Sequence, residues 1–458
     1  MTEDYKNSTT TKRFSSPLTI SIVSHYSATL RLGVPIAIGQ LGVIILGFAD
    51  TLMVGRYSTD ALAASAFVNN LFTLFTFLLM GYSYGLTPIV SALFGQGKLA
   101  EAGEQLKPAL LSGTVFCLLL MAVWGIAYFN LEYFGQPDEL LPLIRPYFLV
   151  ILVSMIFVML YNELRQFTDG LTHTTLGMYT LMIGNALNIV GNWLLIYGPG
   201  PFPEMGLMGA GIATLLARVL MVVLMVAALW WKKGYAPYRE GFARCRTSLD
   251  GMGPIVRASL PIAIQMGLEC AAFTMSAVMA GWVGKVELAA YQVMVTIGTL
   301  GFLLYYSFGA GTSIRVANFY GQHDRTNVFH AGAAGRNLLF LMAACSSLLI
   351  YLLAEPLIRL FTTDTAVIAI SLSLIPFLVL YQFADAMQIC YANILRGTGH
   401  VLAMVRIAII SYLIVNIPAA FILGFSLGWG VKGIFLAFFI GLFTAATLFF
   451  KEYRKAMR

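Results

Sequence analysis

The stretch Pro35-Ile36-Ala37-Ile38 returns as Pro261-Ile262-Ala263-Ile264, and the match between the two regions continues without a gap for 63 residues. Residues 35–97 and 261–323 lie 226 positions apart, with 16 of 63 positions identical and most others apolar in both copies. The identical positions include Gly55 and Gly281, Leu62-Ala63-Ala64 and Leu288-Ala289-Ala290, Gly85 and Gly311, and Gly95-Gln96 and Gly321-Gln322. The sequence therefore predicts a duplicated bundle of membrane helices, an architecture typical of secondary transporters with a site between the halves.

The composition excludes a soluble protein. The chain has 458 residues, of which 59% are hydrophobic and 11% charged, and its mean hydropathy is +0.80. Soluble proteins carry roughly 25% charged residues. The net charge of +7 does not indicate a nucleic-acid partner, because the basic residues are scattered at the ends of apolar segments. The five cysteines show no C-x-x-C spacing, and no nucleotide loop or H-E-x-x-H motif is present, so we expect no cofactor.

A bilayer core of about 30 Å requires about 20 apolar helical residues. Twelve segments satisfy this requirement and predict an all-α integral membrane protein: 33–56, 62–94, 108–130, 143–166, 175–198, 208–231, 256–283, 288–319, 335–354, 366–395, 402–424 and 430–451. Pro35, Pro88, Pro261 and Pro418 are candidate kink points within or beside these helices.

The distribution of Lys and Arg predicts the orientation. With the N-terminus inside, the cytoplasmic side carries 22 basic residues and the outside five, and Arg218 lies within a span. Both termini are therefore expected to be cytoplasmic. We expect a mobile tail (1–30), a first six-helix lobe (31–231), a cytoplasmic linker (232–255), a second lobe (256–451) and a short tail (452–458). Because both lobes start on the same side, the repeats are predicted to be parallel.

Asp50 lies within the first span, where an ionisable side chain costs at least a few kcal/mol and marks a functional site by default. Its counterpart in the second copy is Ser276, so the repeated fold does not explain it. Asn188 and Asn192 share one face of the fifth span, and Thr214 opens the sixth. Together these oxygens predict a site for a hard cation or a proton. The alternative for the asparagines is hydrogen bonding between helices.

Glu269 on the seventh span and Asp385 on the tenth predict a second cluster. Tyr381 and Gln388 share the helix face of Asp385. The alternative is a pair of structural carboxylates satisfied by their neighbours. We expect the substrate to contact Asp50, Glu269 and Asp385, together with Gln265, Gln292 and Gln388.

For two further groups of residues the sequence favours a structural role over a chemical one. Glu163, Arg165 and Asp169, at the cytoplasmic end of the fourth span, are expected to be anchors at the membrane interface, with a place in an inner gate as the alternative. Gly81-Tyr82-Ser83-Tyr84-Gly85 spells the G-x-S-x-G motif of hydrolases, but that motif requires a strand and a turn, whereas here it lies in a membrane helix. We therefore expect no enzyme activity.

The sequence resembles the multidrug and toxic compound extrusion (MATE) family, specifically its NorM-type bacterial branch. The resemblance runs from about residue 30 to 445. It rests on Phe48-Ala49-Asp50-Thr51-Leu52-Met53-Val54-Gly55, Leu164-Arg165-Gln166-Phe167-Thr168-Asp169-Gly170, Leu187-Asn188-Ile189-Val190-Gly191-Asn192-Trp193, Glu269, Tyr381-Gln382-Phe383-Ala384-Asp385-Ala386 and Leu395-Arg396-Gly397.

The resemblance implies a cation-coupled antiporter in the bacterial inner membrane that exports organic, often cationic and amphipathic, drugs. It implies a Na⁺ or H⁺ site at Asp50, Asn188, Asn192 and Thr214, and another at Glu269, Tyr381 and Asp385. Besides drugs, the expected partners are membrane lipids, and we expect a monomer. A lipid-linked precursor flippase of the same superfamily would need several cationic residues in its cavity, whereas Arg218 alone lies in the middle of a predicted span and the other basic residues lie at or near span ends. A membrane-embedded enzyme and a channel are weaker alternatives.

Overall fold

The computed structural model describes residues 22–245 and 249–457, and within these residues every regular element is helical. Twelve helices or helix runs are long and apolar enough to cross a membrane, which confirms the predicted number of spans. The α-helices of the first half are α1 (Ile22–Tyr57), α2 (Thr59–Ser83), α3 (Leu86–Gly95), α4 (Leu99–Glu104), α5 (Leu106–Phe129), α6 (Leu141–Gly170), α7 (Thr174–Tyr197) and α8 (Gly206–Trp231). Those of the remainder are α9 (Ala236–Arg244), α10 (Leu249–Val283), α11 (Lys285–Gly321), α12 (Arg325–Leu352), α13 (Ala354–Arg359), α14 (Thr365–Gly397), α15 (Leu402–Ala408), α16 (Ile417–Phe421) and α17 (Val431–Ala456).

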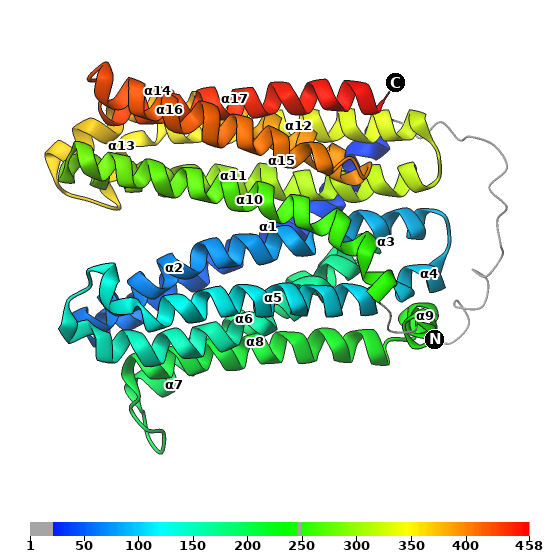
Figure 1. Cartoon of the computed structure of the whole chain (residues 1–458), viewed down its shortest axis with the longest axis horizontal. Helices are drawn as coiled ribbons and strands as arrows, with labels where there is room; N and C mark the ends of the chain where they lie inside the picture. The colour runs from blue at the N-terminus through cyan, green and yellow to red at the C-terminus, as the bar shows by residue number, and fades with distance from the viewer. Residues whose placement is uncertain (1–21, 246–248, 458) are drawn as a thin grey trace.

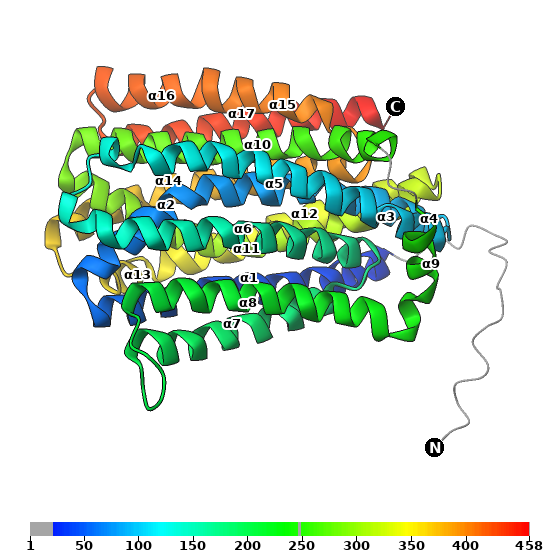
Figure 2. The same cartoon turned by 60° about the horizontal axis from the view of Figure 1, so that its bottom comes forward.

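The helices form two lobes that lie side by side. In Figure 1, α1–α8 occupy the lower half of the molecule and α10–α17 the upper half, with α9 at the end where α17 finishes. Figure 2 shows α4 and α9 at this same end, which we call the linker end. Helix α9 packs against α4, because a Cβ on either Gly103 or Gly241 would overlap the backbone of the opposite helix.

Glycines at repeated positions bring the lobes together. A Cβ on Gly95 would overlap the carbonyl of Asn318, and a Cβ on Gly321 would overlap the carbonyl of Ala92. Gly95 and Gly321 are 226 positions apart, and so are the residues they contact, Ala92 and Asn318. The two contacts are therefore equivalent in the repeat. This reciprocity requires an approximate two-fold axis between the lobes and supports the predicted parallel repeat.

The helices extend beyond the predicted spans, mainly at the linker end. Helix α1 begins at Ile22, α10 at Leu249 and α12 at Arg325, whereas α6 continues to Gly170 and α14 to Gly397. Residues 22–30 of the expected mobile tail are therefore helical, and His25 and Thr29 are buried there. Residues 1–21 lie outside the described part. These polar helix ends were missed because contact between the lobes, rather than lipid, covers them.

Two spans are not continuous α-helices. The predicted segment 62–94 is divided between α2 and α3 at Tyr84 and Gly85. Pro88 explains the break, because its ring conflicts with the carbonyl of Tyr84, four residues earlier. The segment 402–424 contains two π-helical stretches, η4 (Ile409–Asn416) and η5 (Ile422–Ser426). Pro418 lies between them, and the wider π turn removes the same conflict one turn earlier in the chain.

Candidate functional site

The predicted residues of the first lobe meet around Asp50. Nδ2 of Asn192 donates to Oδ1 of Asp50 at 2.5 Å. In the amide orientation that satisfies its neighbours, Asn188 also donates to Asp50 at 2.9 Å and accepts from Oγ1 of Thr214 at 3.0 Å. Helices α1, α7 and α8 therefore bring one carboxylate, two amides and one hydroxyl together, as the sequence predicted.

Arg218 is a neighbour of this cluster that the sequence interpretation left out. It lies on α8, four residues after Thr214, and its guanidinium hydrogen-bonds to Ser154. Its charge is close enough to interact with that of Asp50. The i, i+4 spacing from Thr214 was the signal that could have placed it here. Because the positive charge of Arg218 already interacts with Asp50, it weakens the attraction of Asp50 for a further cation.

Glu269 is the centre of the second cluster. Nε2 of Gln265 donates to Oε2 of Glu269 at 2.7 Å. Gln388 and Tyr412 lie beside Glu269, and Nε2 of Gln388 donates to the Tyr412 hydroxyl at 3.0 Å. Tyr412 was not predicted, because it lies in the π-helical segment η4, whose turn changes the face that each residue presents.

Asp385 lies in the same cluster, and its hydrogen-bond donor is a residue that the sequence did not single out. The hydroxyl of Tyr305 on α11 donates to Oδ2 of Asp385 at 2.9 Å. Tyr381 is buried nearby, with its hydroxyl against Gly298. Sequence spacing favoured Tyr381 because it shares a helix face with Asp385, whereas Tyr305 comes from another helix. Gln292 is exposed, and among the described residues no hydrogen bond joins its side chain to this cluster.

Each cluster contains a buried oxygen that accepts no hydrogen bond from the described residues. These atoms are Oδ1 of Asn192 beside Asp50 and Oε1 of Gln388 beside Glu269. A buried polar atom without a partner costs free energy. An oxygen that lacks a donor next to a carboxylate is suited to bind a cation, because hard cations take oxygen ligands.

Between the lobes, near the linker end, lies a cavity of about 30 Å³. Its polar lining includes Arg165, Gln166 and Asp169 from α6, and Ser313, Asn393 and Arg396 from α11 and α14. Arg165 and Arg396 are 9% and 6% exposed. The interpretation of Arg165 and Asp169 as interface anchors was therefore wrong. Burial by the opposite lobe is a tertiary effect that a count of loop charges cannot detect.

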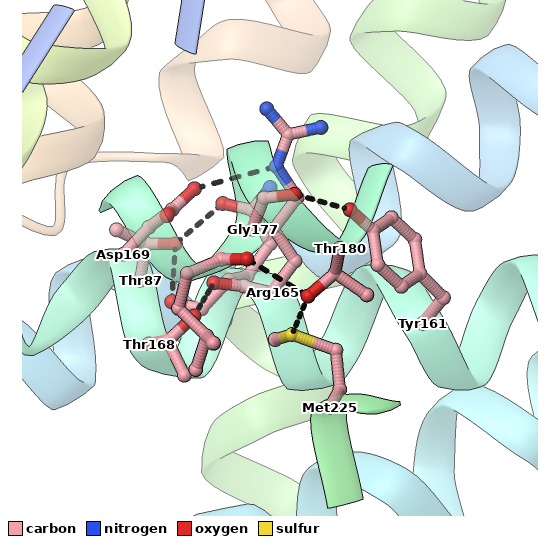
Figure 3. Close-up of polar contacts among 10 residues, drawn as sticks. Thr87, Tyr161, Arg165, Thr168, Asp169, Gly177, Thr180 and Met225 are labelled. Carbon is pink, nitrogen blue, oxygen red and sulfur yellow. Dashed lines mark hydrogen bonds and ion pairs between the residues drawn. The ribbon is translucent and has the colours of Figure 1, made fainter. Parts of the chain in front are cut away.

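Arg165 and Asp169 form an ion pair within this lining. Nε of Arg165 lies 3.7 Å from Oδ2 of Asp169, which is beyond hydrogen-bond length (Figure 3). Glu163, two residues away, is 1% exposed, and neither of its oxygens has a hydrogen-bond partner among the described residues. It faces Gly113 of α5 inside the first lobe rather than the cavity. The three charged residues of this segment thus have different environments.

A chain of hydrogen bonds connects the cavity to the second cluster. Nη2 of Arg396 donates to Oε1 of Gln265 at 2.7 Å, and Gln265 donates to Glu269. A change in the charge or ligand at Glu269 can therefore reach the cavity through a single amide side chain. The two arginines lie near the ends of α6 and α14, one in each lobe. The similar dipeptides Leu164-Arg165 and Leu395-Arg396 were the sequence signal for this correspondence.

Curated relatives match this chain over most of its length. The "Multidrug resistance protein NorM" of Vibrio cholerae serotype O1 is 27% identical over 428 residues, which cover 92% of this chain and 93% of that protein. The protein of the same name from Aliivibrio fischeri is 28% identical over 437 residues and covers 92% of both chains.

Solved structures share the fold. A eukaryotic MATE transporter superposes with a TM-score of 0.85 at 18% identity, covering 95% of this chain and 99% of the other. A MOP superfamily transporter from Pyrococcus furiosus gives a TM-score of 0.84 at 20% identity, covering 94% and 96%. The MatE family profile matches twice, at residues 35–194 and 261–422, once in each lobe. This chain is a member of the MatE family, an integral membrane transporter family with two six-helix lobes.

Proposed function

We propose that this protein is a multidrug antiporter that exports organic, mainly cationic and amphipathic compounds in exchange for inward Na⁺ or H⁺. The observation that carries the proposal is the pair of acid clusters, one in each lobe. Each holds a carboxylate beside a buried oxygen that has no donor among the described residues. The names of the NorM relatives support drugs as the substrate class.

The arrangement of the lobes supports alternating access. The close glycine contacts lie near the linker end, and the distribution of basic residues predicts that this end is cytoplasmic. With that end closed, Asp50 and Glu269 receive cations from outside. Cation binding favours one lobe arrangement only through its differential affinity for the two states. The hydrogen-bond chain from Glu269 to Arg396 gives the second cluster a direct effect on the cavity.

The proposal includes the membrane location, the oligomeric state and the residues that contact substrate and cation. The protein lies in the bacterial inner membrane with both termini in the cytoplasm, and it works as a monomer with lipids around it. Substrate contacts Asp50, Gln265, Glu269, Asp385 and Gln388, with Gln292 at the exposed margin. The candidate cation ligands are Asp50, Asn188, Asn192 and Thr214 in the first lobe, and Glu269, Tyr381 and Asp385 in the second.

The test is ethidium efflux from liposomes that contain the purified protein, with an imposed Na⁺ gradient and, separately, an imposed pH gradient. We expect one of the gradients to drive efflux, which identifies the ion. Asp50→Asn and Asp385→Asn should abolish the gradient-driven part, because each removes a carboxylate from a cation site. Absence of transport with either gradient, across several cationic dyes, would contradict the proposal.

The buried arginines favour a second candidate, a lipid-linked precursor flippase. The argument that Arg218 alone lies within the membrane fails, because Arg165 and Arg396 line the cavity between the lobes. A pyrophosphate-linked lipid would use such cations. Flipping of a fluorescent lipid-linked pyrophosphate in the same liposomes, without ethidium efflux, would place this function first.

A further inference from the structure

The charges around the inter-lobe cavity are unbalanced. Two guanidinium groups, those of Arg165 and Arg396, face one lining carboxylate, that of Asp169. The next carboxylate, Glu269, is reached through the amide of Gln265. Guanidinium groups remain charged when buried, so the cavity wall has an excess of positive charge away from bulk water.

Arg165 has unused hydrogen-bonding capacity. Its ion pair with Asp169 involves Nε at 3.7 Å, and no hydrogen bond joins its guanidinium to any described residue. In Figure 3 its two terminal nitrogens extend away from Asp169. A guanidinium has five N–H donors in a planar fork. Those of Arg165 are therefore available to a group that enters the cavity.

Arg396 approaches the cavity from the other lobe with donors that are also incompletely used. One terminal nitrogen bonds to the neutral amide of Gln265, and Nε has no partner among the described residues. Its guanidinium lies 5.7 Å from the ring centroid of Tyr84, and the charges of both arginines reach the Tyr84 hydroxyl. The two arginines thus face one space from opposite lobes.

We infer that this cavity binds an oxyanion, a carboxylate or phosphate group, between Arg165 and Arg396. Guanidinium groups bind such planar or tetrahedral oxyanions through paired hydrogen bonds. The cavity of about 30 Å³ holds two waters or one such group, and the apolar body of a larger molecule enters when the lobes separate. The inference rests on the proposed function and extends its substrates to amphipathic compounds with an acidic group.

The test uses two dyes that differ by one acidic group. Rhodamine 110 has a free carboxylate, and rhodamine 123 is its methyl ester. Binding to the purified full-length protein in phospholipid-free detergent is measured by fluorescence anisotropy. We expect the protein to prefer rhodamine 110, and Arg396→Gln to weaken its binding by roughly tenfold while rhodamine 123 is unchanged. Arg396→Lys should retain part of the preference.

Two further variants make the test specific. Asp169→Asn removes the competing carboxylate and should strengthen binding of rhodamine 110, the opposite direction from Arg396→Gln. Arg406→Gln removes an exposed arginine outside the cavity and should leave both dyes unaffected. Equal binding of the two dyes to the original protein, or an equal loss in Arg406→Gln, would overturn the inference.

The source of the oxyanion is decided by competition. If phosphatidylglycerol displaces rhodamine 110 but phosphatidylcholine does not, an anionic lipid headgroup is the natural occupant; if neither displaces it, the substrate supplies the group. Should the arginine variants fail to fold, inorganic phosphate should raise the melting temperature of the unmodified protein more than chloride at equal ionic strength. Equal melting temperatures would then contradict an oxyanion site.

The outcomes also separate this inference from the proposed function. Ethidium has no acidic group, so its gradient-driven efflux tests the antiporter alone. Ethidium efflux without a preference for rhodamine 110 would overturn the oxyanion site only. Binding of rhodamine 110 that depends on Arg396, without ethidium efflux, would overturn the antiporter only.

Discussion

Asn192 and Asn185 lie on the same helix, α7, but their amides have different surroundings. Asn192 donates to Asp50 at 2.5 Å, whereas Nδ2 of Asn185 is buried without a partner among the described residues. A hydrogen bond to a charged group contributes about 1.5–3 kcal/mol. We therefore expect Asn192→Leu to slow ethidium efflux by roughly tenfold or more.

Asn185→Leu is the matched control, since it removes the same group from the same helix. Its efflux should stay near that of the original protein, measured in the same liposomes at equal protein content. An equal loss in both variants would mean that the amides act as packing groups rather than as ligands around Asp50.

Asp169 and Glu163 offer a similar comparison for stability. Asp169 is the ion-pair partner of buried Arg165, whereas Glu163 has no partner among the described residues. Removal of one member of a buried pair costs about 3–5 kcal/mol. The Asp169→Asn substitution should therefore reduce the free energy of unfolding by up to about 3 kcal/mol, the lower end of this range, because the contact with Arg165 is long. The reduction is measured as a lower melting temperature of the purified protein.

Glu163→Gln should leave the melting temperature unchanged or raise it, because it removes an unpaired carboxylate and keeps the shape of the side chain. A large loss in this variant would show that Glu163 has a partner that the described contacts lack, such as a bound ion.

Residue spacing predicted only part of the two clusters. It put Asn188 and Asn192 on one helix face, because helical periodicity brings residues four apart together. The grouping of these amides with Asp50 and Thr214, which lie on other helices, came from the chemistry of the residues and from the family resemblance. Neither argument found Tyr305, Tyr412 or Arg218 as neighbours of the carboxylates. Such contacts depend on helix rotation and packing, and one sequence does not encode these in its spacing.

At the scale of the elements, hydropathy located the spans but not their ends. Hydropathy detects residues suited to contact with lipid, whereas His25, Thr29 and Arg315 are polar residues near the ends of α1 and α11 that are buried where the two lobes meet. The break at Tyr84 lies four residues before Pro88, and η4 lies just before Pro418, two of the predicted kink points. The proline rule locates these irregularities, but it does not say whether the helix breaks, as at Tyr84, or widens into a π turn, as in η4.

His173, in the loop between α6 and α7, attaches the linker to the first lobe. Its Nδ1 lies 2.9 Å from the Tyr235 hydroxyl. Burial, followed by the charge of Lys232, lowers the pKa of the His173 imidazole below its usual value of 6.5. His173 therefore binds a proton less readily in the folded protein than in the unfolded chain. The contribution of His173 to stability is present above pH 6.5 and is lost as the pH falls below this value.

His173→Gln should therefore reduce the fall in melting temperature between neutral and mildly acidic pH. The expected change is small, because the ring is still partly exposed to solvent. Melting curves across this pH range provide the measurement, with His400→Gln as the control at the end of α14. Identical pH profiles for the original protein and His173→Gln would contradict the prediction.

At the scale of the whole molecule, the N-terminal turns of α1 join the first lobe to the second. Arg315 of α11 donates to the His25 carbonyl at 2.5 Å and to Oγ1 of Thr29 at 3.2 Å. Asn327 of α12 lies 3.2 Å from Nε2 of His25. Arg315 is 8% exposed, near the end of the predicted segment 288–319. These contacts join the two lobes at the linker end.

Alternating access requires these contacts to break, so their loss should favour the state that is open at the linker end. Arg315→Leu removes three hydrogen bonds of a buried charge, with His25 and Thr29. Their loss costs about 2 kcal/mol or more, which changes a two-state ratio by roughly thirty-fold. Spin labels at Lys98 and Arg325, exposed residues of opposite lobes, report the separation. We expect longer and broader distances in Arg315→Leu.

Arg336→Leu is the control for this experiment, because Arg336 is an exposed arginine of α12 that hydrogen-bonds to its neighbour Asn337. Its distance distribution should match that of the original protein. An unchanged distribution in Arg315→Leu, or the same change in both variants, would mean that glycine packing near Gly95 and Gly321 closes the linker end without help from Arg315. The turns of α1 would then follow the movement of the lobes rather than control it.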